Sequence, residues 1–353
     1  MNKLNATKQW RDAATLMLVA RSGAKRNGYK ILMLKRSAKS KFMPNAYVFP
    51  GGVTSLTTDF TEEWNDIFKR NNYSNKFSRL LNTTKPQPSA YTSNISPGRI
   101  PPELAFRICA IRETFEESGI LLLTDYNGKE IVLDDPTHNL GGEFGTLQSW
   151  RDKINEDDNN FLKLFRSLKS SPSIHQLFDW STWLTPNFVS RRFDTMFYTC
   201  FVDEIPNHGR DCGEEVTETV WLSPFDVWDN SYNFKPPQIH EMLRLSRYKT
   251  FDELKKFTIQ REASGLNTWC AFKKTLKDGF VWTYPGDDFH NADPVAESDT
   301  MNVTINELRE MSRNTNRIEL VTDDTSGAVV LNNIDWFGHP SLDKHVFASG
   351  LLK

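Results

Sequence analysis

Residues 112–120, Arg112-Glu113-Thr114-Phe115-Glu116-Glu117-Ser118-Gly119-Ile120, are the stretch of this sequence that decides the fold. A helix of 3.6 residues per turn that begins near Glu103 turns four apolar side chains to one face: Leu104, Ile108, Ile111 and Phe115. The pattern predicts that this face packs on a sheet and that the helix ends at Gly119.

Three carboxylates, Glu113, Glu116 and Glu117, share the opposite face of this helix. At these spacings each pair of like charges costs a few tenths of a kcal/mol in an isolated helix. A hard divalent cation would offset this repulsion, because Mg²⁺ prefers carboxylate and phosphate oxygens. The alternative is an acidic face that is simply solvated.

The whole string matches the pattern Arg-Glu-apolar-X-Glu-Glu-X-Gly-apolar, except that Thr114 replaces an apolar residue. It resembles the core of the Nudix hydrolases, which makes the solvated face the weaker interpretation. The resemblance implies an α+β fold, the Nudix fold, in which a mixed β-sheet is sandwiched between helices. It implies that Glu113, Glu116 and Glu117 are catalytic metal ligands for Mg²⁺ or Mn²⁺, and that Arg112 orients them. The activity implied is metal-dependent hydrolysis of a diphosphate bond.

The spacing departs from the family pattern Gly-X5-Glu-X7-Arg-Glu. Here residues 53–111 lie between Gly52 and Arg112, which predicts a long insertion, about 54–100, inside the Nudix box. The position eight before Arg112 is Leu104 rather than Glu, so either the fourth acid is lost or Glu103 replaces it. Helical geometry turns Glu103 away from Glu113, and we therefore do not expect Glu103 to be a ligand.

A basic segment precedes the double glycine, running from Arg36 through Lys39 and Lys41 to Gly51-Gly52. It resembles the motif Arg-Ser-X3-Arg-X3-Gly-X3-Phe-Pro-Gly-Gly of the Nudix coenzyme A diphosphatases, with Lys41 in place of Arg. The resemblance implies that Gly51 and Gly52 lie at the bound substrate. Arg36, Lys39 and Lys41 could clamp the 3′-phosphate of coenzyme A. The alternative is an exposed basic loop without a ligand.

Several further segments are similar to flanking features of animal acyl-coenzyme A diphosphatases: 42–44, 105–110, 191–195, 236–238 and 285–287. This implies cleavage of coenzyme A and acyl-coenzyme A into adenosine 3′,5′-bisphosphate and (acyl-)4′-phosphopantetheine. Arg191 and Arg192 either add phosphate contacts or form a surface pair. One of three acids near residue 216 could supply an extra ligand or a base: Glu214, Glu215 and Glu218.

Two other functions stay open. A Nudix enzyme could act on another adenylate diphosphate, such as NADH, ADP-ribose or nucleotide-capped RNA. A non-catalytic module that binds coenzyme A is the second alternative, and the missing fourth acid favours it.

Periodicity predicts the remaining elements more coarsely. Strands are expected at 14–20, 30–34, 192–202 and 215–222, and helices at 61–71, 225–230, 238–248 and 252–262. We expect a Nudix domain over 10–230 and a helical and mixed C-terminal extension over 231–353, packed on it.

The resemblance implies a small-molecule substrate, coenzyme A or acyl-coenzyme A, and the sequence does not determine the oligomeric state. Hydrophobic residues make up 38%, charged residues 25%, and the net charge is −2, so no global charge favours DNA or an anionic membrane. The longest apolar runs are far shorter than the roughly 20 residues of a membrane span. Four separated cysteines indicate reduced thiols.

The resemblance implies a peroxisomal location, but the chain ends in Gly350-Leu351-Leu352-Lys353. This differs from the Ser-Lys-Leu type of peroxisomal address, which has an apolar last residue. A mitochondrial or cytoplasmic location is therefore the alternative, and the basic start at Lys3, Lys8 and Arg11 is weakly typical of a mitochondrial presequence.

Overall fold

A computed structural model describes residues 10–347 of the 353-residue chain, apart from 24–27, 41–42, 71–76, 82–83, 142, 208–215, 230, 297 and 322–326. Predictions that rest on Lys41, Glu214, Glu215 or the last residues of the chain lie outside this range.

An eight-stranded mixed sheet forms the centre of the molecule, in the order β12-β2-β1-β11-β10-β13, with β3 beside β2 and β4 beside β1. The strands are β1 (Arg11–Ser22), β2 (Gly28–Arg36), β3 (Tyr47–Val48), β4 (Gly51–Val53), β10 (Phe178–Leu184), β11 (Phe193–Val202), β12 (Val216–Leu222) and β13 (Thr268–Cys270). β1 pairs with β11 in parallel and with β2 and β4 in antiparallel. The four predicted strands are present.

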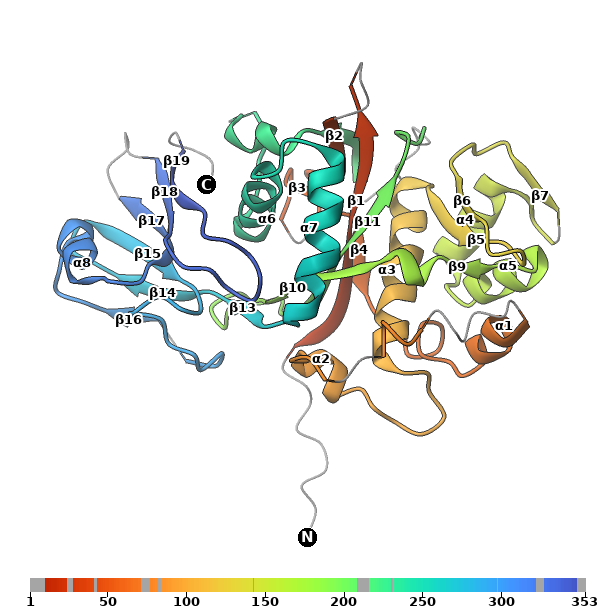
Figure 1. Ribbon diagram of the computed structural model, residues 1–353, viewed down its shortest axis with the longest axis horizontal. Coiled ribbons are helices and arrows are strands. Elements are labelled where there is room, and N and C mark those ends of the chain that lie inside the picture. The colour runs from red at the N-terminus through yellow and green to blue at the C-terminus, as the bar shows by residue number, and fades with distance from the viewer. Residues whose placement is uncertain are drawn as a thin grey trace, which may run out of the picture.

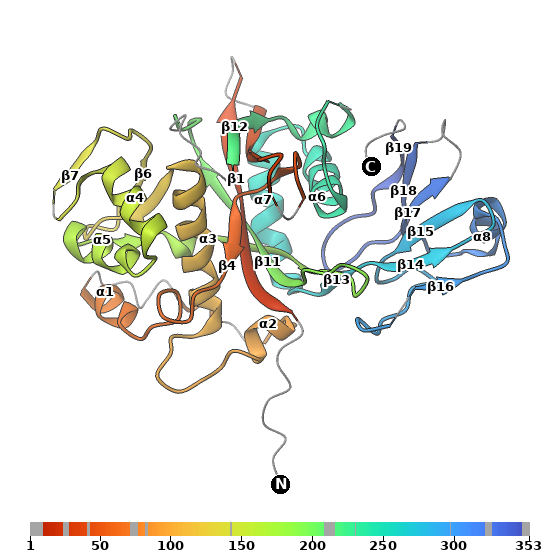
Figure 2. The same cartoon turned by 180° about the vertical axis from the view of Figure 1, so that it is seen from behind.

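Helices cover both faces of this sheet (Figure 1). α3 (Pro102–Ser118) packs on one face, and α6 (Pro236–Ser246) and α7 (Phe251–Arg261) on the other. The reverse view in Figure 2 shows the same order, with β1 and β4 between α3 and α6. The predicted sandwich of a mixed sheet between helices is confirmed.

The residues at its two ends explain the limits of α3. Pro102 occupies the first turn, where its missing N–H has no intrahelical role. Gly119 adopts φ +77°, a left-handed conformation that closes the helix, and its N–H donates to the carbonyl of Phe115. All four side chains of the predicted apolar face, Leu104, Ile108, Ile111 and Phe115, are buried.

The inserted segment is part of the core. It contains α1 (Trp64–Arg70) and α2 (Ser89–Thr92). Its buried side chains, among them Phe60, Trp64 and Tyr91, join the same hydrophobic cluster as α3. The described part of the insertion is therefore packed against the catalytic domain's main core.

Two small sheets and two helices follow α3 at the same end of the molecule (Figure 1). They are β5 (Leu121–Thr124), β6 (Glu130–Leu133), β7 (Asn139–Gly141), β8 (Gly145–Thr146), α4 (Leu147–Glu156), α5 (Asn160–Leu168), β9 (Ser171–Pro172) and the 3₁₀ turn η2 (Ile174–Gln176). The sequence patterns did not predict α4 or α5.

The C-terminal region adds a six-stranded sheet at the opposite end. Its order is β16-β14-β15-β17-β18-β19. The strands are β14 (Phe272–Thr275), β15 (Gly279–Thr283), β16 (Asp299–Thr300), β17 (Asn316–Val321), β18 (Ala328–Asn332) and β19 (Asp343–Val346), accompanied by α8 (Ile305–Met311) and η4 (Glu262–Ser264). Ile318 and Val330 share a buried cluster with Trp180 of β10, so this extension packs on the central sheet. The division at residue 230 stays a prediction.

The predicted helices over 61–71, 238–248 and 252–262 correspond to α1, α6 and α7. In place of the helix predicted at 225–230, the described residues form a 3₁₀ helix, η3 (Pro224–Trp228), capped by Ser223. None of the helices in the described residues combines the length and the apolar character needed to cross a membrane.

Candidate active site

The last two turns of α3 bring Arg112 and the three predicted carboxylates together. Arg112 is 3% exposed and forms a two-pronged ion pair with Asp59: its Nε and Nη2 each donate to a carboxylate oxygen at 2.9 Å. Asp59 is fully buried. Bidentate charged pairs of this kind fix orientation as well as charge, so Arg112 is held rigidly below the helix face.

The remaining guanidinium nitrogen of Arg112 holds two of the glutamates. Its Nη1 donates to Oε1 of Glu113 and to Oε1 of Glu116, both at 2.9 Å. Both glutamate side chains are only 15% exposed. The orienting role predicted for Arg112 agrees with these contacts. The face is not a solvated acidic surface.

Glu117 is attached to the double glycine instead. Its Oε2 accepts a hydrogen bond from the main-chain N–H of Gly51 at 2.9 Å. At Gly52 a Cβ atom would stand 2.4 Å from Oε2 of Glu113, and at Gly51 it would stand 2.4 Å from the carbonyl oxygen of Ala14. Only glycine lets β4 approach both β1 and the catalytic helix so closely.

Burial strongly affects the protonation of these acids. Burial, together with Glu113, raises the pKa of Glu117 to about 8, although the Gly51 N–H acts in the opposite direction. Burial raises the pKa of Glu113 to about 7 against the effect of Arg112. The pKa of Glu116 is raised for the same reason. A desolvated carboxylate with too little positive charge nearby holds its proton.

The charges at this place are unbalanced in a way that fits a divalent cation. Asp59, Glu113 and Glu116 surround one buried guanidinium, that of Arg112, and Glu117 lies in the next contact at Gly51. All four side chains offer hard carboxylate oxygens. Across the described ranges, however, no three His, Cys, Asp or Glu side chains are arranged to hold a metal ion. Glu113 and Glu116 face Arg112, while Glu117 faces Gly51. The ligand roles of the three glutamates stay predictions.

Asp59 is the functional residue that the sequence patterns missed. It lies seven positions after Gly52, close to the place where the family pattern has its first Glu, and 53 positions before Arg112. The position eight before Arg112 is Leu104, and its neighbour Glu103 is the nearest acid to that position. Glu103 lies ten residues before Glu113, about 15 Å along the helix axis. Counted forward from Gly52, the family pattern places its first Glu at Thr58, the residue directly before Asp59.

Arg36 is the best placed of the predicted substrate-binding cations. It is the last residue of β2, its guanidinium donates to Ser40, and its charge acts to lower the pKa of Glu117. Lys39 is an exposed residue in the following turn. The structure therefore brings Arg36 near the acidic end of α3, while the binding roles of Arg36, Lys39 and Lys41 stay predictions.

Arg191, Arg192 and Glu218, the remaining described residues with predicted roles, have other contacts than those of the acidic end of α3. Arg192 donates to the side-chain oxygen of Asn187 and lies 5.4 Å from the ring of Trp10, and Arg191 is exposed. Glu218 faces Lys35 at 3.8 Å on the neighbouring strand β2. Among the described residues, none of these contacts reaches α3, and the roles of Arg191, Arg192 and Glu218 in binding or as a base stay predictions.

Comparison with known proteins identifies this arrangement. The sequence model of the NUDT19 Nudix domain matches residues 10–245. The chain is a Nudix hydrolase of the NUDT19 family. It is 34% identical to the acyl-coenzyme A diphosphatase NUDT19 of Xenopus laevis, over 90% of this chain and 92% of the relative. Identity to the human protein of the same name is 33%, over 81% of each chain.

A solved structure supports the fold of this Nudix hydrolase. A Nudix hydrolase from Alicyclobacillus acidocaldarius superposes with a TM-score of 0.50 at 19% identity, covering 70% of this chain and 96% of the other. Family membership makes the chain a Nudix diphosphatase enzyme with the α+β Nudix fold, and the six-stranded C-terminal sheet lies beyond the matched domain.

Proposed function

We propose that this Nudix enzyme hydrolyses the diphosphate bond of coenzyme A and acyl-coenzyme A. The products are adenosine 3′,5′-bisphosphate and 4′-phosphopantetheine or its acyl form. One observation carries the proposal: the buried acidic C-terminal end of α3 lies near Arg36, the cationic last residue of β2. The relatives that carry the name acyl-coenzyme A diphosphatase support the choice of substrate.

Each residue of the site has a distinct proposed task. Glu113, Glu116 and Glu117 would hold Mg²⁺ or Mn²⁺ through their carboxylate oxygens. A divalent cation held there would supply positive charge against the diphosphate and would make the attacking water more acidic. Arg112, fixed by Asp59, orients Glu113 and Glu116 and limits their mutual repulsion.

The glycines and the basic strand end position the substrate. The absence of side chains at Gly51 and Gly52 leaves the main chain of β4 open beside Glu113 and Glu117. Arg36, with Lys39 and Lys41, binds the 3′-phosphate that distinguishes coenzyme A from most other adenylate diphosphates.

A product assay tests the proposal. The enzyme is incubated with coenzyme A, 3′-dephospho-coenzyme A, NADH and ADP-ribose, each with Mg²⁺ or Mn²⁺, and products are separated by chromatography. We expect adenosine 3′,5′-bisphosphate from coenzyme A at a rate well above that of the other three substrates. Faster cleavage of NADH or ADP-ribose would favour the other adenylate substrates. Tight binding of coenzyme A without turnover would favour the non-catalytic module.

A further inference from the structure

The C-terminal end of α3 carries negative charge that no basic residue in the last turn of the helix neutralises. The aligned peptide dipoles place partial negative charge at a helix C-terminus, where cations are favourable and carboxylates are not. Here the last two turns contain Glu113, Glu116 and Glu117, and the last turn contains no basic residue.

The main chain at this end also has carbonyl groups without helical partners. The last four carbonyls of any helix lack an intrahelical donor. The N–H of Gly119 satisfies the carbonyl of Phe115, which leaves three carbonyls, those of Glu116, Glu117 and Ser118, beyond the last helical hydrogen bond.

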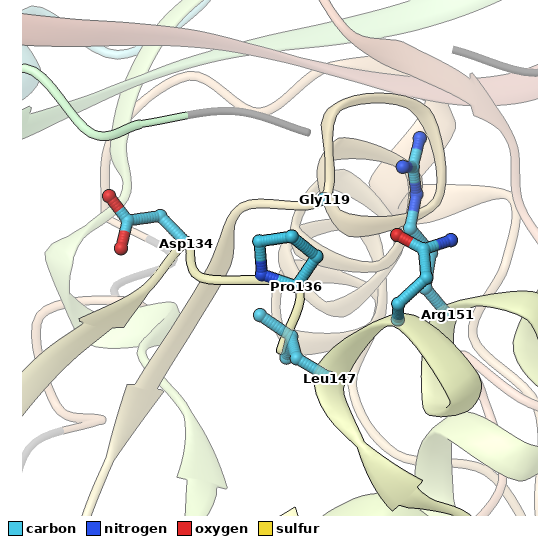
Figure 3. Close-up of a pocket in the computed structure, with 6 residues that line it drawn as sticks. Gly119, Asp134, Pro136, Leu147 and Arg151 are labelled. Atoms are coloured by element: carbon cyan, nitrogen blue, oxygen red, sulfur yellow. The ribbon is translucent and has the colours of Figure 1, made fainter. Parts of the chain in front are cut away.

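Arg151, on α4, supplies both the donors and the charge. Its Nε donates to the carbonyl oxygen of Glu116 and its Nη2 to that of Glu117, each at 2.9 Å. The side chain is 3% exposed. Figure 3 shows it extending from α4 to the end of α3 beside Gly119, where a Cβ atom on Gly119 would stand 3.5 Å from Nη1.

The helix that presents Arg151 is itself firmly seated. Thr146 caps α4 by accepting from the N–H of Ser149. Leu147, Trp150 and Ile154 are each 1% exposed and belong to the hydrophobic cluster of α3. Arg151 therefore projects from a rigid support, which suits a residue that fixes another element.

The same segment also holds the turn that contains Asp59. Just after α4, Asp158 and Asn159 accept from the hydroxyl of Thr58 at 2.8 and 3.1 Å. Asp59 follows Thr58 directly and pairs with Arg112. The segment around α4 thus contacts the site from two sides.

We propose that Arg151 is a positioning residue for the catalytic helix: by binding the main-chain oxygens of Glu116 and Glu117, it fixes the separation of the metal-binding carboxylates. It touches neither substrate nor metal. This inference rests on the ligand roles given to Glu116 and Glu117 in the proposed function.

The test is a Mn²⁺ titration of the full-length protein followed by electron paramagnetic resonance, with kcat for coenzyme A measured in parallel. Removal of an outer-shell partner typically costs 10–100-fold in metal affinity or activity. We expect Arg151→Ala to raise the Kd for Mn²⁺ by about tenfold or more. Lys153→Ala is the matched control, because Lys153 lies on the same helix and pairs with the exposed Glu156.

Chemical rescue separates positioning from general stability. Millimolar guanidinium should restore part of the Mn²⁺ affinity of Arg151→Ala, and Arg151→Lys should retain more affinity than Arg151→Ala. If Arg151→Ala melts at a lower temperature but binds Mn²⁺ with the wild-type Kd, the role is purely structural and the inference is overturned. If Arg151→Ala does not fold, the same Mn²⁺ titration is made with Arg151→Gln, whose side chain is neutral and of similar length. An unchanged Kd in that variant would overturn the inference.

The Mn²⁺ titration uses no substrate. A wild-type enzyme that fails to cleave coenzyme A would refute the proposed function, whereas an unchanged Kd in Arg151→Ala would refute only the positioning role.

Discussion

Two buried clusters of acidic side chains lie near opposite ends of α3. They differ in how many cationic side chains neutralise their carboxylates. Near the start of α3, Asp179 is 3% exposed and accepts from Arg107 at 2.6 Å and from Lys85 at 3.0 Å. Burial alone would raise its pKa, but Arg107 and Lys85 hold that pKa below the ordinary 3.8. At the other end, the pKa values of Glu113 and Glu117 rise to about 7 and 8.

The difference lies in the number of cations, because both clusters are buried. Asp179 has two buried cationic partners, and Arg261 also donates to its carbonyl oxygen. At the α3 end, three carboxylates, those of Asp59, Glu113 and Glu116, share the guanidinium of Arg112, and Arg151 likewise donates only to main-chain oxygens of α3 in the contacts described above. A compensated cluster joins parts of the fold, whereas an uncompensated one is suited to bind additional positive charge.

The largest effect should come from breaking the balanced cluster. Asp179→Asn leaves Arg107 and Lys85 buried without their carboxylate, and we expect the free energy of unfolding to fall by about 3–5 kcal/mol. Urea denaturation measures this change. Asp203→Asn is the control, since the side chain of Asp203 is 81% exposed and a surface pair contributes at most about 1 kcal/mol.

The pH dependence of stability in wild type and Asp179→Asn tests whether the loss comes from the buried ion pair. Because the folded pKa of Asp179 is depressed, its stabilisation is present above the unfolded pKa of about 3.9 and is lost as pH falls through the folded value. The gap between wild type and Asp179→Asn should therefore be constant near neutrality and narrow below about pH 4. A gap that persists at lower pH would contradict the ion-pair explanation.

The unbalanced cluster should respond in activity rather than in stability. We expect Glu116→Gln to lower kcat with Mg²⁺ by about tenfold or more. Loss of a residue that merely supports a metal ligand typically costs about 10–100-fold, and loss of a ligand should cost no less. The melting temperature without metal should not fall, because one of several repelling charges is removed. Glu156→Gln, on the exposed side of α4, is the control. Retention of more than a tenth of kcat would count against Glu116 as a ligand.

Asp59 belongs to the unbalanced cluster but acts through Arg112, so its effect should be intermediate. Asp59→Asn should lower kcat by about tenfold, because Arg112 keeps its contacts with Glu113 and Glu116 but loses its anchor. Steady-state kinetics at saturating Mg²⁺ measure this loss. Unchanged kinetics would mean that Arg112 needs no carboxylate from the insertion.

The smallest effect is expected at the edge of the site. Arg36→Ala should raise KM for coenzyme A by about fivefold, equivalent to about 1 kcal/mol, the scale of a partly exposed charged contact. KM for 3′-dephospho-coenzyme A should change much less, and Lys30→Ala on the same strand serves as control. Equal losses on both substrates would place Arg36 at the diphosphate instead of the 3′-phosphate.

Local patterns were sufficient to predict the catalytic helix. The apolar period of α3, its stop at Gly119 and its three carboxylates depend on residues within a few turns of one another, and these predictions are confirmed as structure. The strands β1, β2, β11 and β12 were also found, because their apolar runs are continuous.

Contacts between distant residues were not predictable in this way. Asp59 was missed because its partner lies 53 positions away and an insertion disrupts the family spacing. Arg151 contacts main-chain oxygens, and because every residue has one, no sequence pattern identifies this contact. The C-terminal sheet consists of short strands whose pairing depends on the rest of the fold.

The insertion between Asp59 and Arg112 has a consequence for the order of folding. Arg79 in this segment pairs with Glu262, 183 positions later, and Lys85 pairs with Asp179, 94 positions later. Contacts so distant in sequence form slowly, since the entropy of closing a long loop is lost before they stabilise it. During synthesis, the helix that contains the acids emerges well before the residues that anchor the segment beside it. We therefore expect the catalytic helix to gain its full native surroundings only after Glu262 has left the ribosome.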